Sequence, residues 1–443
     1  MIMSEQTVDA VVIGGGTAGF GAALAAARHG LSVSLIEATA KVGGVMAFCP
    51  SMPWGGGYPA GRNIGGIFEE LTHKLLKLHP PAATVRPSTL ENFGAEVIYD
   101  HQAATHVMFE MLEEAKVDLH LGTIVGDPLV EGRRITAIDA FDRRGPLRLR
   151  AGAVIDCSGD GELSARAGVP YAVGNGTGDM MGVTLSFTMI NADWSKVFAT
   201  PDPYFERYSA EGIRDGHLHP DLAKLYLMKG FHEGSVFCNT VHIRGVDGTD
   251  PGAVARATQE GRRRCRAVAQ FLTDAVPGFE KARMIDLGPT VGVRETRRLE
   301  ALHRITGAEI ARATKFVDGI VACDNPIDDV MRGDGAMTHD AALRQGDFYT
   351  IPLSSLIPRT IENLLFAGRL ICADALAFAS VRGMPQCMAM GQAVGTAASV
   401  ALKDRQSVQL LNRDSVVQIL IRDGINRIGQ RFNCVQHEAA DHF

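Results

Sequence analysis

The glycines near the start of the chain have the spacing of a phosphate-binding turn. An apolar, β-branched run over residues 8–13 leads into the segment 14–19, and an alanine-rich stretch predicted to be a helix continues to His29. The first glycine permits a tight turn, the second lets backbone amides approach a pyrophosphate, and the third lets the helix pack close to the strand. The phosphates would then meet the helix N-terminus. The residues expected there are Gly14, Gly16, Thr17, Ala18 and Gly19.

A carboxylate follows at the place where dinucleotide-binding folds bind the ribose. Residues 32–36 are predicted to form a second strand, and Glu37 ends it about twenty residues after the glycines. Its side chain, with Ala38 beside it, can accept hydrogen bonds from an adenosine ribose, and its charge argues against a ribose 2′-phosphate. Both FAD and NAD fit this part of the sequence.

Gly43 and Gly44 close this opening unit. Residues 46–58, which begin with Met46, follow as a loop rich in glycine, proline and aromatic residues. Such a loop either lines one face of a flat ring or lies on the surface of the protein.

A second segment that could contact a flat ring lies near the other end of the chain. A predicted strand over 363–367 ends in Gly368 and Arg369, and Arg382 precedes a helix of small residues that begins near Met384 and runs to about residue 401. The N-terminus of that helix would stabilise negative charge on a reduced flavin, although a helix of this composition also fits plain packing.

Two arginines are candidates for binding an anionic substrate. Arg294 lies in the glycine-containing turn 291–294, and Arg382 immediately precedes the small-residue helix. A planar guanidinium in such a position can bind a carboxylate through two hydrogen bonds. Arg294 could instead pair with its neighbour Glu295 or hold two lobes together.

Redox chemistry also needs a group that moves a proton. His242 and His303 lie on predicted strands over 236–243 and 298–305, and Tyr349 adjoins a proline-containing crossover at 351–358. For each histidine taken alone, the pattern favours a structural role with its ring nitrogens satisfied.

Size and composition indicate a globular α/β enzyme. A chain of 443 residues exceeds what one core usually supports, which favours two interleaved lobes, and nearly half of the residues are apolar. The net charge of -6 is mild, and the basic run 262–266 lies in a predicted helix with an apolar face, so we read it as a solvated helix face. We therefore expect small-molecule partners and no nucleic acid.

The cysteines and the first residues of the sequence indicate the cellular compartment in which we expect the protein. The eight cysteines are widely spread without a C-x-x-C pair, so we expect reduced, mostly buried thiols and no metal centre. The sequence opens without a signal-like leader, and the apolar stretch 10–35 is interrupted by glycines, Arg28 and His29. We expect a cytoplasmic protein that does not span a membrane.

Together, these segments resemble the FAD-dependent oxidoreductases that have a single glutathione-reductase-like Rossmann FAD domain and are distantly similar to fumarate reductase flavoproteins. The resemblance spans nearly the whole chain, and its most specific part includes Val246-Asp247-Gly248-Thr249-Asp250-Pro251. The segments that carry it are 11–44, 154–161 with 167–170, 245–261 with 291–298, and 363–398.

The resemblance implies a position for each part of FAD. The adenosine would lie along 14–19 and Glu37 and contact Val125, Ser158 and Gly159. The flavin would reach Gly43, Gly44, Met46, Gly368, Arg369 and Met384.

The sequence departs from the family pattern in two places. Relatives can link flavin to a His shortly after the Gly pair, but here residues 45–49 contain none, so we expect non-covalent FAD with Cys49 a minor covalent candidate. Relatives also tend to show a His after a Pro-Ile-Asp stretch, whereas this chain reads Asp329 and Val330, which puts the substrate and the proton carrier in doubt.

The predicted fold class is α/β, a Rossmann-like FAD-binding domain with an inserted α+β substrate domain. The expected division is 1–170 and 351–443 for the FAD-binding domain and 171–350 for the substrate domain. Because no second glycine fingerprint follows a strand into a helix, we expect no NAD(P)H domain, and electrons would pass to an external acceptor or oxygen.

The leading functional hypothesis is hydride transfer between a small polar, possibly carboxylated, substrate and flavin N5. A redox-neutral flavin-dependent hydratase or isomerase is the first alternative. The second is an FAD-holding subunit of a larger complex. A homo-oligomer is compatible with all three, and fold analogy does not decide between them.

Overall fold

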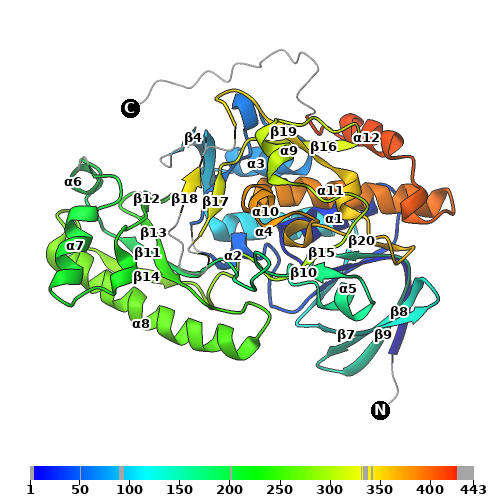
Figure 1. The fold of residues 1–443 in the computed structure, drawn as a ribbon, viewed down its shortest axis with the longest axis horizontal. Coiled ribbons are helices and arrows are strands. Elements are labelled where there is room, and N and C mark those ends of the chain that lie inside the picture. Colours follow the sequence, from blue (N-terminus) through cyan, green and yellow to red (C-terminus); the bar gives the residue numbers. More distant parts are fainter. Residues whose placement is uncertain are drawn as a thin grey trace.

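The largest sheet of the described residues is mostly parallel, and its strands β7, β8 and β9 lie at the lower right of Figure 1. The structure, a computed structural model, describes residues 4–49, 51–88, 94–199, 202–330, 332, 338–340 and 343–426. The sheet has the strand order β6-β2-β1-β9-β8-β7, and β20 pairs with β9. β6, β2, β1, β9 and β20 are parallel, whereas β8 and β7 extend the sheet through antiparallel pairs. The strands are β1 Ser4–Ile13, β2 Val33–Glu37, β6 Asp118–Leu121, β7 Ile124–Glu131, β8 Arg134–Asp142, β9 Gly145–Asp156 and β20 Leu364–Phe366.

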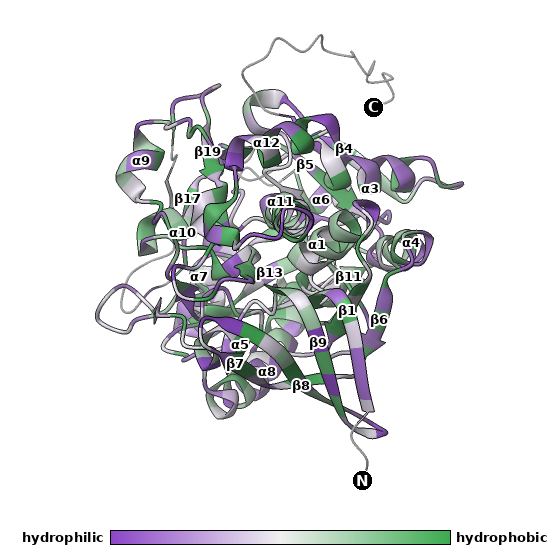
Figure 2. Ribbon diagram, turned by 90° about the vertical axis from the view of Figure 1, so that its right-hand side faces the viewer, coloured by the Kyte–Doolittle hydropathy of each residue, from purple (hydrophilic) through white to green (hydrophobic). Residues whose placement is uncertain are grey.

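Helix α11 (Met384–Lys403) packs against α1 (Thr17–Arg28) almost backbone to backbone. A Cβ at Gly391 would lie only 1.9 Å from the carbonyl oxygen of Ala18, and one at Gly395 would lie 2.3 Å from another α1 carbonyl. From the other side, a Cβ at Gly21 would lie 2.4 Å from the carbonyl oxygen of Met388. Figure 2 looks nearly along α11, which lies beside α1. The small residues of both helices therefore let a helix from the N-terminal part of the sequence pack directly against one from the C-terminal part.

Other helices surround this pair and the large sheet. Four of those described come from the N-terminal part of the chain, before residue 170, and three come from residues 307–422. They are α2 Val45–Phe48, α3 Gly66–Leu76, α4 His101–Glu114, α5 Glu162–Arg166, α9 Gly307–Ala311, α10 Ala375–Val381 and α12 Arg413–Arg422.

A second, antiparallel sheet has the order β12-β13-β11-β14, and the long helix α8 runs along it (Figure 1). Helices α6 and α7 lie at its far end. Its elements are β11 Val183–Ile190, α6 Trp194–Val197, α7 Glu206–Arg214, β12 Leu227–Lys229, β13 Val236–Ile243, α8 Pro251–Ala275 and β14 Arg283–Leu287.

The two faces of this second sheet differ in chemistry, although both are buried. The odd-numbered residues 183–189 of β11 are apolar and form a core with apolar residues of α8. The opposite face carries Thr184, Ser186 and Thr188 of β11 and His242 of β13, none more than 5 % exposed. Thr184 and His242 are direct partners across the two strands. A buried polar face is thus built into this sheet.

Small sheets complete the fold. One packs Trp54 against Tyr99, with the ring centroids 4.1 Å apart. The pairs and their bounds are β3 Trp54–Gly55 and β4 Ala83–Pro87 on β5 Ala95–Tyr99; β10 Tyr171–Ala172 with β15 Arg298–Leu299; β16 Gly319–Cys323 with β19 Tyr349–Pro352; and β17 Ile327–Asp329 with β18 Thr338–Asp340.

The structure corrects some predicted elements. The strand predicted over 298–305 is wrong beyond Leu299, because the amides of Leu302 and His303 donate to an irregular segment near residues 354–357 and not to a strand ladder. The loop predicted over 46–58 contains a short helix and a strand, and Trp54 in it is buried, so this part is not a surface loop. Pro50 in that loop lies outside the described residues.

Two further observations concern the described residues as a whole. None of their helices combines the length and the apolar character that crossing a bilayer requires. The described cysteines are free, and all except Cys49 are buried, whereas Cys434 lies outside the described residues.

Candidate active site

The turn between β1 and α1 combines two glycines that fit tightly and one that faces open space. Gly14 has a φ of +88°, and a Cβ there would lie 2.5 Å from the carbonyl oxygen of Cys157. A Cβ at Gly19 would lie 1.7 Å from the Gly14 carbonyl oxygen. By contrast, a Cβ at Gly16 would meet no atom within 4 Å. Gly16 is the N-cap of α1, and no side chain caps that helix end. Its amides are therefore open to a ligand.

Glu37 ends β2 with its carboxylate against this turn. Its Oε2 accepts from the amide of Gly15 and its Oε1 from the amide of Thr39, each at 2.7 Å. These two hydrogen bonds hold the carboxylate in place, and they use only one lone pair on each of its oxygens. The remaining lone pairs can still accept hydrogen bonds from ribose hydroxyls.

The other residues assigned to the adenosine lie beside Glu37. Ala38 follows it directly and is exposed. The amide of Thr123 donates to the Glu37 carbonyl at 3.1 Å, and Val125 stands two residues further along, at the start of β7. The structure therefore brings the start of β7, with Val125, close to the end of β2, where Glu37 lies.

The Gly pair lies directly on the phosphate-binding turn. Gly43 forms a parallel bridge with Gly16, and a Cβ at Gly44, whose φ is +53°, would lie 3.0 Å from the Gly16 Cα. Met46, in α2, is fully buried, and its carbonyl accepts a hydrogen bond from the Tyr99 hydroxyl at 3.4 Å.

Gly368 and Arg369, from the C-terminal part of the chain, also lie beside the phosphate-binding turn. Gly368 has a φ of +79°, and a Cβ there would lie 3.1 Å from the Cβ of Ala18, in the first turn of α1 after Thr17. The guanidinium of Arg369 donates from Nη2 to Asp160 at 3.2 Å and lies over Gly159, where a Cβ would come within 2.6 Å of it. Nη1 of Arg369 is buried and has no hydrogen-bond partner within the described part of the chain.

A buried aspartate shapes the loop that carries Ser158. Asp156, at the end of β9, accepts hydrogen bonds from the amide and hydroxyl of Ser158 and from those of Ser164. The loop lies against the turn, since a Cβ at Gly14 would be 2.8 Å from the Ser158 Cα. Met384 begins α11, whose N-cap Gly383 leaves that helix end without a side-chain cap.

Arg294 lies beside the polar face of the second sheet. Gly292 bridges to Thr184, which places the turn 291–294 along β11. The Arg294 Nη1 donates to the Thr184 hydroxyl and, at 3.0 Å, to the carbonyl of Gly182. Burial, together with the nearby positive charge of Arg382, lowers the pKa of the Arg294 guanidinium to about 10. The group nevertheless stays charged at neutral pH.

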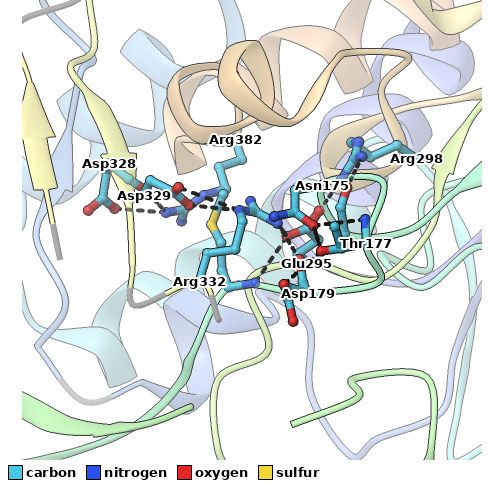
Figure 3. Close-up of polar contacts among 11 residues, drawn as sticks. Asn175, Thr177, Asp179, Glu295, Arg298, Asp328, Asp329, Arg332 and Arg382 are labelled. Carbon is cyan, nitrogen blue, oxygen red and sulfur yellow. Dashed lines mark hydrogen bonds and ion pairs between the residues drawn. The ribbon is translucent and has the colours of Figure 1, made fainter. Parts of the chain in front are cut away.

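Arg382 lies next to Arg294 but is bound differently. Its Nη2 donates to the carboxylate of Asp328 at 2.8 Å and to the carbonyl of the same residue at 2.9 Å. Gly182 connects the surroundings of the two arginines. Its carbonyl accepts from Arg294, and its amide donates at 2.7 Å to the carbonyl of Val330, two residues after Asp328. Arg382 is therefore neutralised by a carboxylate, as Figure 3 shows.

His242 is adjacent to this pair on the polar face. Its Nδ1 lies 2.9 Å from the carbonyl oxygen of Thr240, and its ring contacts Tyr226 edge to face. Because a carbonyl only accepts, Nδ1 carries the proton in the neutral ring and Nε2 is the basic nitrogen. Burial raises the pKa of Tyr226, and the nearby Tyr204 and Asp328 raise it further.

Cys49 closes the site on the side of the Gly pair. Its Sγ lies 3.1 Å from the Ser186 hydroxyl. Burial raises the pKa of the thiol to about 11, although Arg294 opposes this shift. Cys49 is therefore a protonated thiol at neutral pH.

A buried ion network supports the turn that carries Arg294. The carboxylate of Glu295 is fully buried and pairs with both Arg298 and Arg332. Arg332 also pairs with Asp329, and in Figure 3 it lies between Glu295 and Asp329. The Met181 amide donates to Glu295 at 3.1 Å. The alternative that Arg294 itself pairs with Glu295 is wrong, because Glu295 uses these other partners.

Comparison with known proteins identifies the fold and the cofactor. The sequence profile described as FAD dependent oxidoreductase matches residues 9–420. The chain belongs to this family. FAD is therefore the cofactor of this FAD-dependent oxidoreductase. None of the curated proteins compared matches the sequence.

Solved structures with the same fold are distant in sequence. The p-nitrophenol 4-monooxygenase PnpA from Pseudomonas putida DLL-E4 is 12 % identical, with a TM-score of 0.50 over 94 % of this chain and 86 % of that one. The flavin-dependent brominase Bmp2 is also 12 % identical, with a TM-score of 0.50 over 94 % of this chain and 83 % of that one. They show the fold alone, and the predicted α/β class with a Rossmann-like FAD-binding fold is confirmed.

The residues of the turn fit FAD. The space beside Gly16 leaves room for a pyrophosphate. The uncapped N-terminus of α1 and the Nη1 of Arg369, which has no partner among the described residues, offer donors to it. The structure brings them together from segments more than 300 residues apart.

Two of the candidate proton carriers lie elsewhere. Tyr349 is fully buried on β19, and its hydroxyl bonds to Ser380 at 2.7 Å. Burial raises the pKa of Tyr349 well above its usual value. His303 lies outside any strand, pairs with Glu309 at 3.2 Å and contacts Phe316. Neither residue contacts Arg294, Arg382 or His242 among the interactions of the described residues.

Sequence reasoning missed the polar side chains that complete the site. No role was expected for Thr184 and Ser186. The sequence nevertheless carries a signal, because residues 184, 186 and 188 are Thr, Ser and Thr between apolar neighbours, an alternation that is typical of a strand with one polar face. Asp328, the partner of Arg382, has no such signal, since only the fold brings it to α10 and α11.

Proposed function

We propose that this FAD-dependent oxidoreductase transfers hydride between a small polar substrate and N5 of FAD, at the polar face of the second sheet. The observation that carries this proposal is the buried row of Thr184, Ser186 and His242 opposite Cys49, which follows the Gly pair within five residues. FAD, when bound, supplies the hydride acceptor or donor. The protein supplies orientation, proton transfer and exclusion of water.

His242 moves the proton in this proposal. The Thr240 carbonyl fixes its tautomer, so Nε2 is the nitrogen that can take a proton from a substrate hydroxyl or amine. Thr184 stands directly across the strand pair and binds Arg294. The substrate would therefore meet a hydroxyl, a base and a cation on one surface.

The cofactor assignments belong to the same proposal. We propose that Gly14, Gly16, Gly19 and Arg369 hold the pyrophosphate and that Glu37 holds the ribose, within an FAD-binding domain formed by 1–170 and 351–443. The remaining contacts proposed are Thr17, Ala18, Ala38, Gly43, Gly44, Met46, Val125, Ser158, Gly159, Gly368 and Met384. FAD would bind without a covalent link, because the only nucleophile in 45–49 is Cys49, which is a protonated thiol.

The test is anaerobic reduction of the bound flavin. The holoprotein is mixed with hydroxy acids, amino acids, polyols and amines, and bleaching of the flavin absorption is followed. With a substrate that bleaches it, His242→Asn should slow reduction by about 10²- to 10⁴-fold at neutral pH, since asparagine keeps a donor to Thr240 but lacks the base. The pH dependence of the rate should also disappear.

His106→Asn is the matched control, because His106 is exposed on α4 and, among the described residues, forms an ion pair with Glu110 alone. Its reduction rate should equal that of the wild type. If no compound in the panel bleaches the flavin, or if His242→Asn reduces it at the wild-type rate, the proposal is wrong.

A further inference from the structure

Arg294 is a charged group at the site without a carboxylate of its own. Both of its hydrogen bonds use Nη1, and both acceptors, the Gly182 carbonyl and the Thr184 hydroxyl, are neutral. Within the described part of the chain, no carboxylate forms an ion pair with it. An uncompensated cation in a partly buried position is costly unless a ligand neutralises it.

Each of the neighbouring arginines has a carboxylate partner. Asp328 pairs with Arg382, and Glu295 with Asp329 pairs with Arg298 and Arg332 (Figure 3). Asp286, near Cys49, lies 3.4 Å from His101, but burial lowers the pKa of that imidazole, so Asp286 keeps its own negative charge at neutral pH. Within the described part of the chain, Arg294 is therefore the arginine of this group that has no ion-pair partner.

We propose that the substrate carries one carboxylate and that Arg294 binds it through Nε and Nη2. This inference rests on the proposed function and names its substrate class, a monocarboxylate. Thr184 and Gly182 hold Nη1, so the guanidinium is already oriented before the ligand arrives, which reduces the entropy that binding must overcome.

The same arrangement disfavours dicarboxylates. A second carboxylate would need Arg382, which would have to release Asp328. The Asp328 side chain is only 20 % exposed, so its freed carboxylate would remain partly buried beside two substrate anions. The pairing of Arg382 with Asp328, beside an Arg294 that has only neutral acceptors, thus favours one carboxylate over two.

The experiment measures ligand binding to the oxidised holoprotein, so it does not depend on turnover. The probes are the matched pairs acetate and acetamide, lactate and lactamide, and benzoate and benzamide, together with malonate and succinate. Binding is followed by perturbation of the flavin spectrum. At least one monocarboxylate should bind about 10- to 100-fold more tightly than its amide and more tightly than either dicarboxylate.

Variants locate this preference. Arg294→Gln should bind the acid and the amide equally, whereas Arg294→Lys keeps the charge and should retain part of the preference. Arg283→Gln is the matched control, because it removes the same charge from an exposed position on β14 of the same sheet. It should keep the full preference.

The inference is overturned if no carboxylate perturbs the spectrum, if an amide or a dicarboxylate binds as tightly as the best monocarboxylate, or if Arg294→Gln keeps the preference. These outcomes differ from failure of the proposed function. A neutral substrate that bleaches the flavin in a His242-dependent manner would leave the proposed function intact and would refute only the monocarboxylate.

Discussion

Replacing Gly16 with valine should separate cofactor binding from folding. No protein atom lies within 4 Å of a Cβ at this position, and the φ of −67° with ψ of −174° is open to any L residue. The polypeptide can therefore accept the side chain. Because Gly16 caps α1, the branched side chain would occupy the space in which we place the FAD pyrophosphate.

The expected magnitude follows from the hydrogen bonds at that helix end. Displacing the pyrophosphate from two charge-assisted hydrogen bonds would cost about 3–6 kcal/mol. FAD would then bind about 10²- to 10⁴-fold more weakly. The free energy of unfolding of the apoprotein should stay within about 1 kcal/mol of the wild-type value, since no contact is lost and a glycine is removed from the unfolded chain.

The assay combines two measurements on the same variant. Quenching of FAD fluorescence during reconstitution gives the Kd, and urea unfolding of the apoprotein gives the stability. Gly19→Ala is the control with the opposite pattern, because its Cβ would lie 1.7 Å from the Gly14 carbonyl oxygen. It should destabilise the apoprotein by about 1–3 kcal/mol or more. If Gly16→Val retains stoichiometric FAD with an unchanged Kd, the pyrophosphate is not at Gly16.

Two further predictions concern packing and the thiol. Gly391→Ala should lower the free energy of unfolding by about 1–3 kcal/mol, because its Cβ would lie 1.9 Å from the Ala18 carbonyl oxygen, and an unchanged urea midpoint would contradict the close α1–α11 contact. Since burial raises the pKa of Cys49 to about 11, alkylation of native Cys49 by iodoacetamide should be slow at pH 8 and accelerate until about pH 11, so a rate that levels off below pH 9 would refute the burial. The stability that the protonated thiol contributes is present below its unfolded pKa of 9.0 and is lost as the pH rises towards 11.

The cofactor half of the molecule could be predicted because its rules are local. Backbone distances constrain Gly14 and Gly19 so strongly that only glycine fits, and the strand and helix around them follow from apolar runs and alanine content. The same reasoning predicts the strand over 236–243, which is β13 with the same bounds. Short-range patterns therefore determine these elements.

The substrate half could not be predicted in this way. Residues 298–305 were expected to form a strand, but the amides of Leu302 and His303 donate to the carbonyls of Ile357 and Ser354, in and just after a 3-10 helix, which no local pattern reveals. Tyr349 looked available beside the crossover, yet Ser380 from α10 satisfies its hydroxyl. The partners of Arg382 and Glu295 are likewise distant in sequence, so their ion pairs emerge only from the tertiary fold.

The buried polar face of the second sheet is itself an argument for function. Alternating Thr and Ser in a strand usually mark a face in water, where they cost nothing. Here Thr184, Ser186 and Thr188 are buried, and each buried polar group must find a hydrogen-bond partner or cost about 1–3 kcal/mol. An apolar face would fold at least as stably, because α8 already covers the other side with an apolar core. The partners that satisfy this face, Arg294 for Thr184 and Cys49 for Ser186, are the residues that line the site at which we propose that the polar substrate binds.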